Sequence, residues 1–165
     1  YLKSPQWLRN IKDKKYSFWR LDTLFSDKKY SNVKFINNVE FVNDSKATNI
    51  QSVKVAIDSY NKPIILILGG YNKGADFRLL LPHIKSSNVR DIVSYGDAGG
   101  QINTALGDAV SSVQVTDLNS AVKKAHSLAT PGDIVLLSPG CASFDQFPNF
   151  EVRGNFYKSV VKNEL

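Results

Sequence analysis

Three polar segments of the sequence hold residue types that bind anionic ligands. They are "NDSKATN" (residues 43–49), "GGYNKGAD" (69–76) and "SPGCASFDQFPNF" (138–150). Lys46 and Lys73 each supply an ammonium group. In the second segment, glycine N–H groups stand beside that ammonium, an arrangement that suits a phosphate or a carboxylate. The third segment combines small residues with phenylalanines, which can shape a pocket.

Each segment also has a purely structural interpretation. Asn, Asp and Ser form turns, and Thr48 is placed to be the N-cap of the helix that follows. That interpretation leaves Lys46 unexplained. "GGYNKGAD" matches neither a Walker A loop nor the GxGxxG dinucleotide fingerprint, so it is either an anion site or an ordinary strand-to-helix turn. Cys141 is interpreted as a small buried residue, and no ligand spacing predicts a metal site.

The spacing of apolar residues predicts strands that alternate with helices. "VKFI" (33–36) and "VEFV" (39–42) flank Asn37 and Asn38, which predicts a β-hairpin because Asn tolerates positive φ. Further strands are predicted over 63–70, 89–95, 112–116 and 134–138, with helices over 50–60, 76–81, 98–105, 118–128 and 150–161. This alternation is typical of right-handed βαβ units and a mostly parallel sheet.

The three polar segments each follow a predicted strand. The carboxyl ends of parallel strands lie at one edge of a sheet, and ligands bind in the crevice outside that edge. The residues alone therefore predict an α/β domain that binds an anionic small molecule at its strand ends.

The net charge of +6 is concentrated at the N-terminal end of the chain. Residues 1–34 hold nine Lys/Arg and three Asp/Glu, whereas residues 35–165 hold twelve of each sign. A basic leader with aromatic residues can bind a polyanion weakly. We favour the alternative, in which 1–34 is the remnant of a preceding domain and 35–165 is the ligand-binding domain. The single cysteine fits a reducing cytosol, and no apolar run reaches the ~20 residues of a membrane span.

In order and spacing, the three segments resemble the C-terminal domain of the Mur ligase family. The resemblance covers residues 38–165 and rests on "FVNDSKATN", "LILGGYNKGADF" and "LLSPGCASFDQFPNFEVRGNFY". "NDSKATN" is typical of the branch that adds D-glutamate. Gly140 stands where the family usually has alanine. Family members have three domains, and the P-loop and magnesium carboxylates of the central domain are not found in this sequence.

The resemblance implies a Rossmann-like three-layer α/β domain with a mostly parallel sheet and an N-terminal β-hairpin. It also implies an ATP-dependent ligase of peptidoglycan precursor synthesis, which joins D-glutamate to UDP-N-acetylmuramoyl-L-alanine through an acyl phosphate. ATP and Mg²⁺ would be bound mainly by the central domain. We therefore expect this chain alone to be inactive, and we assign no catalytic residue within it.

Matched residue by residue, the resemblance implies two sets of ligand contacts. The residues implied to bind D-glutamate are Thr48, Lys73, Ser143 and Phe150, the last through its backbone. Asp44 and Lys46 are implied to face the nucleotide. The expected partners are these small molecules, with neither nucleic acid nor membrane, for a cytoplasmic monomer.

Two other functions remain open at this point. One is a non-catalytic Rossmann-like domain that binds a nucleotide or an acidic metabolite in the same crevice. The other is an interaction module built on the basic leader. The length of the source gene discriminates between them, because a ligase gene encodes about three domains.

Overall fold

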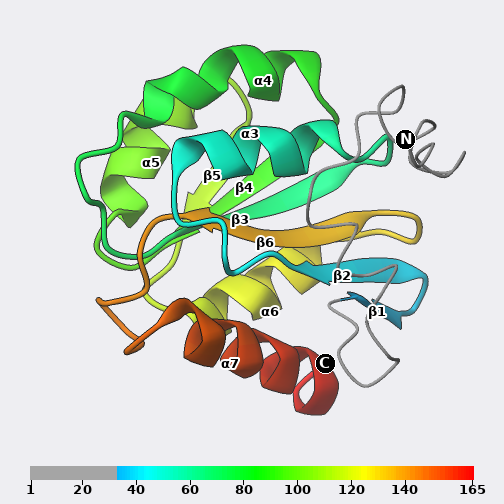
Figure 1. The fold of residues 1–165 in the computed structure, drawn as a ribbon. Helices are drawn as coiled ribbons and strands as arrows, with labels where there is room; N and C mark the ends of the chain where they lie inside the picture. The colour runs from blue at the N-terminus through cyan, green and yellow to red at the C-terminus, as the bar shows by residue number, and fades with distance from the viewer. Residues whose placement is uncertain (1–32) are drawn as a thin grey trace, which may run out of the picture. The chain divides into compact units, whose positions relative to one another are not determined.

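The computed structural model of the protein describes residues 33–165, which form a six-stranded sheet covered by helices (Figure 1). The strands are β1 (Val33–Ile36), β2 (Val39–Asn43), β3 (Ile64–Gly69), β4 (Val89–Tyr95), β5 (Ser111–Gln114) and β6 (Ile134–Gly140). The helices are α3 (Ile50–Asp58), the 3₁₀ helix η2 (Phe77–Leu80), α4 (Leu81–Ser86), α5 (Gly99–Leu106), α6 (Leu118–Leu128) and α7 (Phe150–Asn163). The predicted basic leader lies almost wholly outside the described residues.

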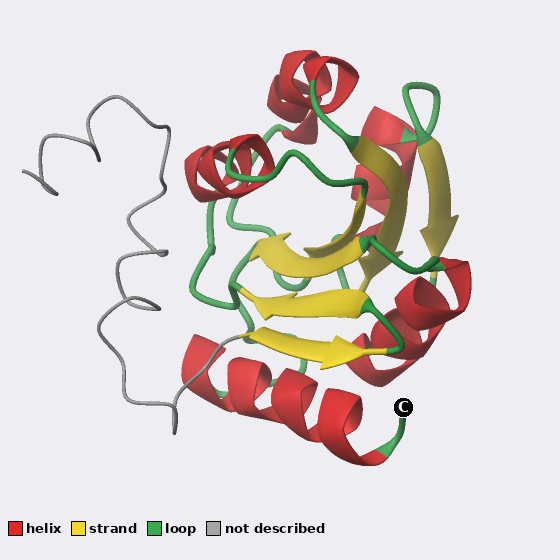
Figure 2. Cartoon of the chain, turned by 90° about the vertical axis from the view of Figure 1, so that its right-hand side faces the viewer, coloured by secondary structure: helices red, strands yellow, loops and turns green. Residues whose placement is uncertain are grey.

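The sheet has the strand order β1-β2-β6-β3-β4-β5. Only β1 runs antiparallel to its neighbour, and the other four pairings are parallel. Helices α3, α4 and α5 cover one face, while α6 and α7 cover the other (Figure 1). Figure 2 shows the sheet between these two helical layers. The predicted three-layer α/β fold with a mostly parallel sheet and an N-terminal hairpin is therefore confirmed.

The hairpin forms around the two asparagines that predicted it. Asn37 and Asn38 have φ values of 50° and 64°, the left-handed conformation that a two-residue hairpin turn requires. β1 and β2 then pair from Val33 opposite Val42 to Ile36 opposite Val39. The domain boundary predicted after residue 34 falls inside β1.

The hydrophobic core lies on both faces of the sheet. All residues of β3 and of β6 are buried, as expected for central strands of a parallel sheet covered on both sides. Ile64, Leu66 and Leu68 pack toward α3, α4 and α5, whereas Ile65 and Ile67 pack toward α6 and α7. The alternation of side chains along β3 thus supplies both halves of the core.

Two local details differ from the sequence-based expectation. Asn49, rather than Thr48, is the N-cap of α3, and its side-chain oxygen accepts a hydrogen bond of 2.9 Å from the N–H of Ser52. The prediction for Thr48 was wrong because both residues are good caps and the neighbour has the extended backbone conformation of a cap. The helix predicted over 76–81 is the short 3₁₀ helix η2, which is followed at Leu81 by α4, and Pro82 lies in the first turn of α4, where its missing N–H costs nothing.

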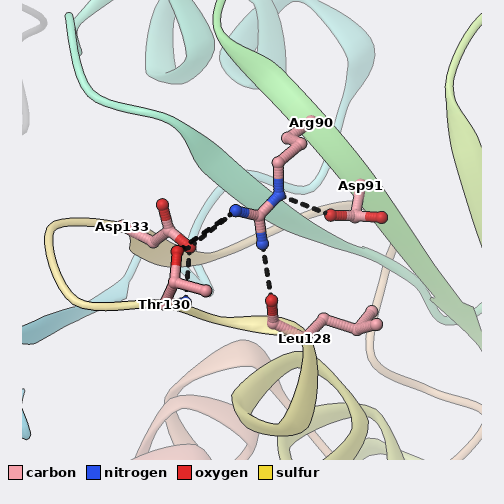
Figure 3. Close-up of polar contacts among 5 residues, drawn as sticks. All are labelled: Arg90, Asp91, Leu128, Thr130 and Asp133. Carbon is pink, nitrogen blue, oxygen red and sulfur yellow. Dashed lines mark hydrogen bonds and ion pairs between the residues drawn. The ribbon is translucent and has the colours of Figure 1, made fainter.

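The amino ends of the strands are joined by Arg90 (Figure 3). Its guanidinium forms ion pairs with Asp91 at 2.8 Å and Asp133 at 3.0 Å, and donates to the carbonyl of Leu128. Asp133, which is buried, also accepts bonds of 2.6 and 2.9 Å from the N–H and hydroxyl of Thr130. These contacts hold the turn before β6 against β4, at the edge opposite the predicted ligand site.

Candidate functional site

The carboxyl ends of β3 and β6 form the topological switch point of the sheet. The two strands are neighbours, but the helices that follow β3 cover one face and α7, which follows β6, covers the other (Figure 1). A crevice outside such a pair of strands is the usual ligand site of doubly wound sheets. The loops after β2, β3 and β6 leave from this edge, so the predicted convergence of the three polar segments is confirmed.

The loops after β3 and β6 are joined by a backbone bridge. The N–H of Tyr71 donates to the carbonyl of Ala142 at 2.9 Å, and the N–H of Ala142 donates back at 3.1 Å. Gly70 precedes the bridge with a φ of 122°, and a Cβ there would lie 2.3 Å from the oxygen of Ala142. The bridge therefore requires glycine, and it brings the segments that carry Lys73 and Ser143 together.

Asn72 shapes the loop that presents Lys73. Its side-chain oxygen accepts from the N–H groups of Gly74 and Ala75 at 3.0 and 2.7 Å, and its amide donates to Gln101 of α5 at 2.7 Å. These bonds are those of an Asx turn, which is a structural role for the asparagine. Lys73 itself is exposed at the tip of the loop, where its ammonium is available to an anion.

Cys141 is a buried thiol, 1% exposed, between these loops. Burial raises its pKa to about 12, although the nearby charges of Arg153 and Lys73 act in the opposite direction. The thiol is therefore protonated at neutral pH and is not a nucleophile. This agrees with its interpretation as a small packing residue.

The loop after β2 is attached to the end of β6. The N–H of Asp44 donates to the carbonyl of Leu137 at 2.8 Å, and the N–H of Gly140 donates to the carbonyl of Ala47 at 2.8 Å. The Asp44 carboxylate is only 8% exposed and accepts a bond of 2.9 Å from the hydroxyl of Ser138. Burial raises the pKa of Asp44 to about 7, against the smaller lowering effect of this hydrogen bond.

The other predicted residues of this loop are more accessible than Asp44. Lys46 is exposed and Thr48 is partly exposed, at the same edge of the sheet. The carboxylate of Asp44, in contrast, accepts its hydrogen bond from Ser138. The assignment of Asp44 and Lys46 to the nucleotide stays a prediction.

The loop from Cys141 to Asn149 begins at β6 and ends at α7. Ser143 is 2% exposed, and its carbonyl accepts from the N–H groups of Gln146 and Phe147 at 3.1 and 2.7 Å. Asn149 caps α7 through a bond of 2.8 Å from the N–H of Val152. Phe150 is the first residue of that helix, where backbone N–H groups have no partner within the helix and attract a carboxylate.

The same loop crosses the ends of the remaining strands. The side chain of Gln146 accepts from the N–H of Leu118 at 3.1 Å and donates to the carbonyl of Thr116 at 3.2 Å, both beyond β5. The carboxylate of Asp145 accepts a longer contact of 3.4 Å from the N–H of Asp97, beyond β4. Burial raises the pKa of Asp145. Contacts to every neighbouring strand end thus hold Ser143 in place.

Sequence reasoning missed the residue that joins these loops most closely, Arg153. It is completely buried, and its guanidinium donates to the hydroxyl and carbonyl of Ser45 at 2.9 and 2.7 Å and to the carbonyl of Cys141 at 3.1 Å. One signal was present: Arg153 lies four residues before Tyr157 and seven before Val160, both of which are buried. That spacing puts the arginine on the buried face of α7.

The described residues offer no metal site or membrane span. Among residues 33–165, no three His, Cys, Asp or Glu side chains lie close enough to hold a metal ion. No helix within the same residues is long and apolar enough to cross a membrane.

The strand order and the helical layers on both faces define a domain of the doubly wound α/β class. Residues 31–141, which are well over half of the chain, match the glutamate ligase domain of the Mur ligases. The chain therefore belongs to the Mur ligase family, and the resemblance predicted from the three loop motifs is confirmed.

Similar proteins carry one common name, UDP-N-acetylmuramoylalanine–D-glutamate ligase. The protein of that name from Chlamydia caviae is 46% identical over 125 residues, which is 76% of this chain and 30% of the relative. The relative from Clostridioides difficile is 44% identical, and the match covers 79% of this chain and 29% of that relative. The relative from Syntrophus aciditrophicus is 42% identical, and the match covers 77% of this chain and 28% of that relative. The chain thus spans about 30% of the length of the curated relatives it matches.

Proposed function

We propose that this chain is the C-terminal, D-glutamate-binding part of an ATP-dependent ligase that joins D-glutamate to UDP-N-acetylmuramoyl-L-alanine. The observation that supports the proposal is the backbone bridge between Tyr71 and Ala142, which brings together the loops that carry Lys73 and Ser143. The printed name of the relatives supports the identity of the amino acid.

The proposed reaction forms an amide bond between the alanyl carboxylate of the nucleotide-sugar and the amine of D-glutamate. ATP, bound with Mg²⁺, supplies its γ-phosphate to the alanyl carboxylate of the nucleotide-sugar, and ADP leaves. The amine of D-glutamate then attacks the resulting acyl phosphate, loses a proton and displaces phosphate. The residues of this chain would hold D-glutamate so that its amine faces the acyl carbon. Positioning of this kind contributes to rate by removing the entropy cost of bringing two reactants together.

D-Glutamate brings two carboxylates into the crevice, and each must exchange water for fixed donors. We assign Lys73 and the hydroxyls of Thr48 and Ser143 to these carboxylates, together with the backbone N–H of Phe150. Charge-assisted hydrogen bonds of this kind contribute roughly 1.5–3 kcal/mol each. Lys46 would approach the phosphates of the nucleotide from the neighbouring loop.

The two carboxylate-binding elements suit the ligand electrostatically. Lys73 is an exposed cation in the loop after β3. The first turn of α7, with 14 residues in the helix, presents the positive end of a helix dipole where the loop after β6 ends. Because an acidic amino acid has two negative groups, two separate positive elements bind it better than one.

An assay of the intact parent polypeptide tests the proposal. Purified parent, supplied with ATP, Mg²⁺ and UDP-N-acetylmuramoyl-L-alanine, should release phosphate only when D-glutamate is added, and should form the amide product. L-Glutamate is the matched control and should support little release. Residues 1–165 alone should be inactive, because the sequence contains no P-loop. If the parent binds the nucleotide but releases no phosphate when D-glutamate is added, the result would favour a non-catalytic binding domain.

We further propose that the parent acts as a monomer in the cytoplasm. Both ATP and UDP-linked sugars are substrates of that compartment. Size-exclusion chromatography with light scattering measures the oligomeric state, and a stable dimer would contradict this part of the proposal.

A further inference from the structure

Arg153 is a charged residue with no access to solvent. Its side chain is 0% exposed, and its three hydrogen bonds end on two backbone carbonyls and one hydroxyl. Burial of a guanidinium is costly unless its donors are satisfied, so a buried arginine of this kind marks a place where precise geometry matters. Its guanidinium nitrogens all donate to protein oxygens, so we assign Arg153 no contact with a ligand.

Ser45 extends the network to the first turn of α7. Its hydroxyl accepts from the Nε of Arg153 at 2.9 Å and donates to the carbonyl of Phe150 at 2.8 Å. Both roles of the hydroxyl are therefore used within the protein. A single buried side chain, 5% exposed, thus connects the loop after β2 with the residue whose backbone we assign to D-glutamate.

Close packing of α7 against the same loop reinforces these bonds. The side-chain amide of Asn43 donates to the carbonyl of Gly154 at 3.1 Å. A Cβ at Gly154 would lie 3.0 Å from the amide nitrogen of Asn43 and 3.2 Å from the Cβ of Ser45. Glycine, which has no Cβ, therefore allows the helix to approach the loop this closely.

We propose that Arg153, acting through Ser45, is a positioning residue for the D-glutamate pocket. The network fixes the first turn of α7 and the loop that carries Ser143 relative to the loop that carries Thr48. This inference rests on the proposed function, because it names the residues that set the geometry of the same pocket. Arg153 touches no substrate and performs no chemical step.

The expected effect is on affinity for one substrate. The residues assigned to D-glutamate lie on separate loops, and ligand groups held by several elements must be placed within about 0.5 Å. Loss of the Ser45 hydroxyl releases one bond to Arg153 and one to Phe150, while leaving two other bonds of the guanidinium in place. A partial displacement of α7 should therefore weaken D-glutamate binding without unfolding the domain.

The experiment compares three variants of the full-length parent. Ser45→Ala and Arg153→Lys perturb the network, and Arg90→Ala is the matched control at the opposite edge of the sheet (Figure 3). Ser45→Ala and Arg153→Lys should raise the KM for D-glutamate about tenfold and leave the KM for the nucleotide-sugar within twofold. Arg90→Ala should lower Tm while leaving both KM values unchanged. If Arg153→Lys does not fold, Ser45→Ala decides.

Hydrogen exchange of the same proteins gives a readout that does not depend on activity. In Ser45→Ala, amide exchange should rise together in residues 44–48 and 143–150, and stay unchanged in 128–133. A fall in Tm with an unchanged KM for D-glutamate and unchanged exchange in these segments would show that Arg153 only stabilises the fold. If the wild-type parent uses no D-glutamate, the proposed function fails, and the exchange data still decide whether the two loops are coupled.

Discussion

The carboxylate of Asp44 and the hydroxyl of Ser138 form a hydrogen bond of 2.9 Å between the ends of β2 and β6. Asn43 and Leu137 are paired in the parallel register, so the two residues that follow them become neighbours. Ser138 is completely buried and Asp44 nearly so. An acidic group is thereby held where its charged form is poorly solvated.

Replacing Asp44 by Asn should change how stability depends on pH. Burial raises the pKa of Asp44 in the folded protein to about 7, from an ordinary value of 3.8. Between these values the folded protein retains a proton that the unfolded chain has released, so stability falls as pH rises from about 4 to about 7, and then levels off. Asp44→Asn should remove this fall and be more stable at pH 8, by on the order of 3 kcal/mol. Urea denaturation at several pH values measures it.

The control for that experiment is Ser138→Ala. The hydroxyl of Ser138 lowers the pKa of Asp44 in the folded protein, so its removal should extend the fall in stability to higher pH while its onset near pH 4, set by the unfolded chain, stays in place. Equal pH profiles for wild type and Asp44→Asn would show that Asp44 is ionised in the folded protein across this range.

Lys73→Ala in the full-length parent should weaken the binding of D-glutamate and leave the binding of the nucleotide-sugar unchanged. Lys73 is the exposed cation of the loop that is bridged to Ser143. Loss of one charge-assisted bond should raise the KM for D-glutamate by at least about tenfold, since ~1.4 kcal/mol is one decade. Steady-state kinetics with each substrate varied in turn measures the change. Lys85→Ala, on the exposed side of α4, is the control and should have no effect. A raised KM for the nucleotide-sugar alone would place a different ligand beside Lys73.

Asp133→Ala should destabilise the fold without changing ligand binding. The buried carboxylate accepts from both the N–H and the hydroxyl of Thr130 and pairs with Arg90 (Figure 3). Its loss leaves these donors without their acceptor, at a cost of about 2 kcal/mol in the free energy of unfolding. Thermal denaturation should show a fall in Tm of roughly 5 °C. Arg78→Ala, which removes the exposed partner of Asp76 and leaves the N-cap bond of η2 in place, should change Tm little.

Residues 33–165 should fold without the preceding segment. Within these residues a six-stranded sheet is covered by helices on both faces, and each face has its own cluster of buried apolar residues. We expect a single cooperative thermal transition, with the same midpoint by circular dichroism and by calorimetry. A broad transition that sharpens when residues 1–32 are restored would show that the segment belongs to the folding unit.

Much of the fold was predictable because its signals are local. Asn37 and Asn38 specified the hairpin turn through their tolerance of positive φ. The apolar residues of α6 recur at helical spacing, and the helix was found where predicted, from Leu118 to Leu128. The polar segments after strands indicated the ligand edge, because parallel strands place their carboxyl ends together.

Local signals failed where two adjacent residues could serve the same role. Thr48 and Asn49 are both suitable N-caps, and only the backbone conformation at the second decides between them. That conformation depends on how the loop is attached to β6, through the bond from Gly140 to Ala47.

The contacts that shape the site were decided by the tertiary structure alone. Asp44 and Ser138 are 94 residues apart in the sequence, and Ser45 and Arg153 are 108 apart. The sequence by itself determined the strands, most of the helices and the positions of the three polar loops, since turn chemistry and apolar spacing act over a few residues. Which buried groups would meet depended on the strand order, which places β2 beside β6, and that order is a property of the packed sheet.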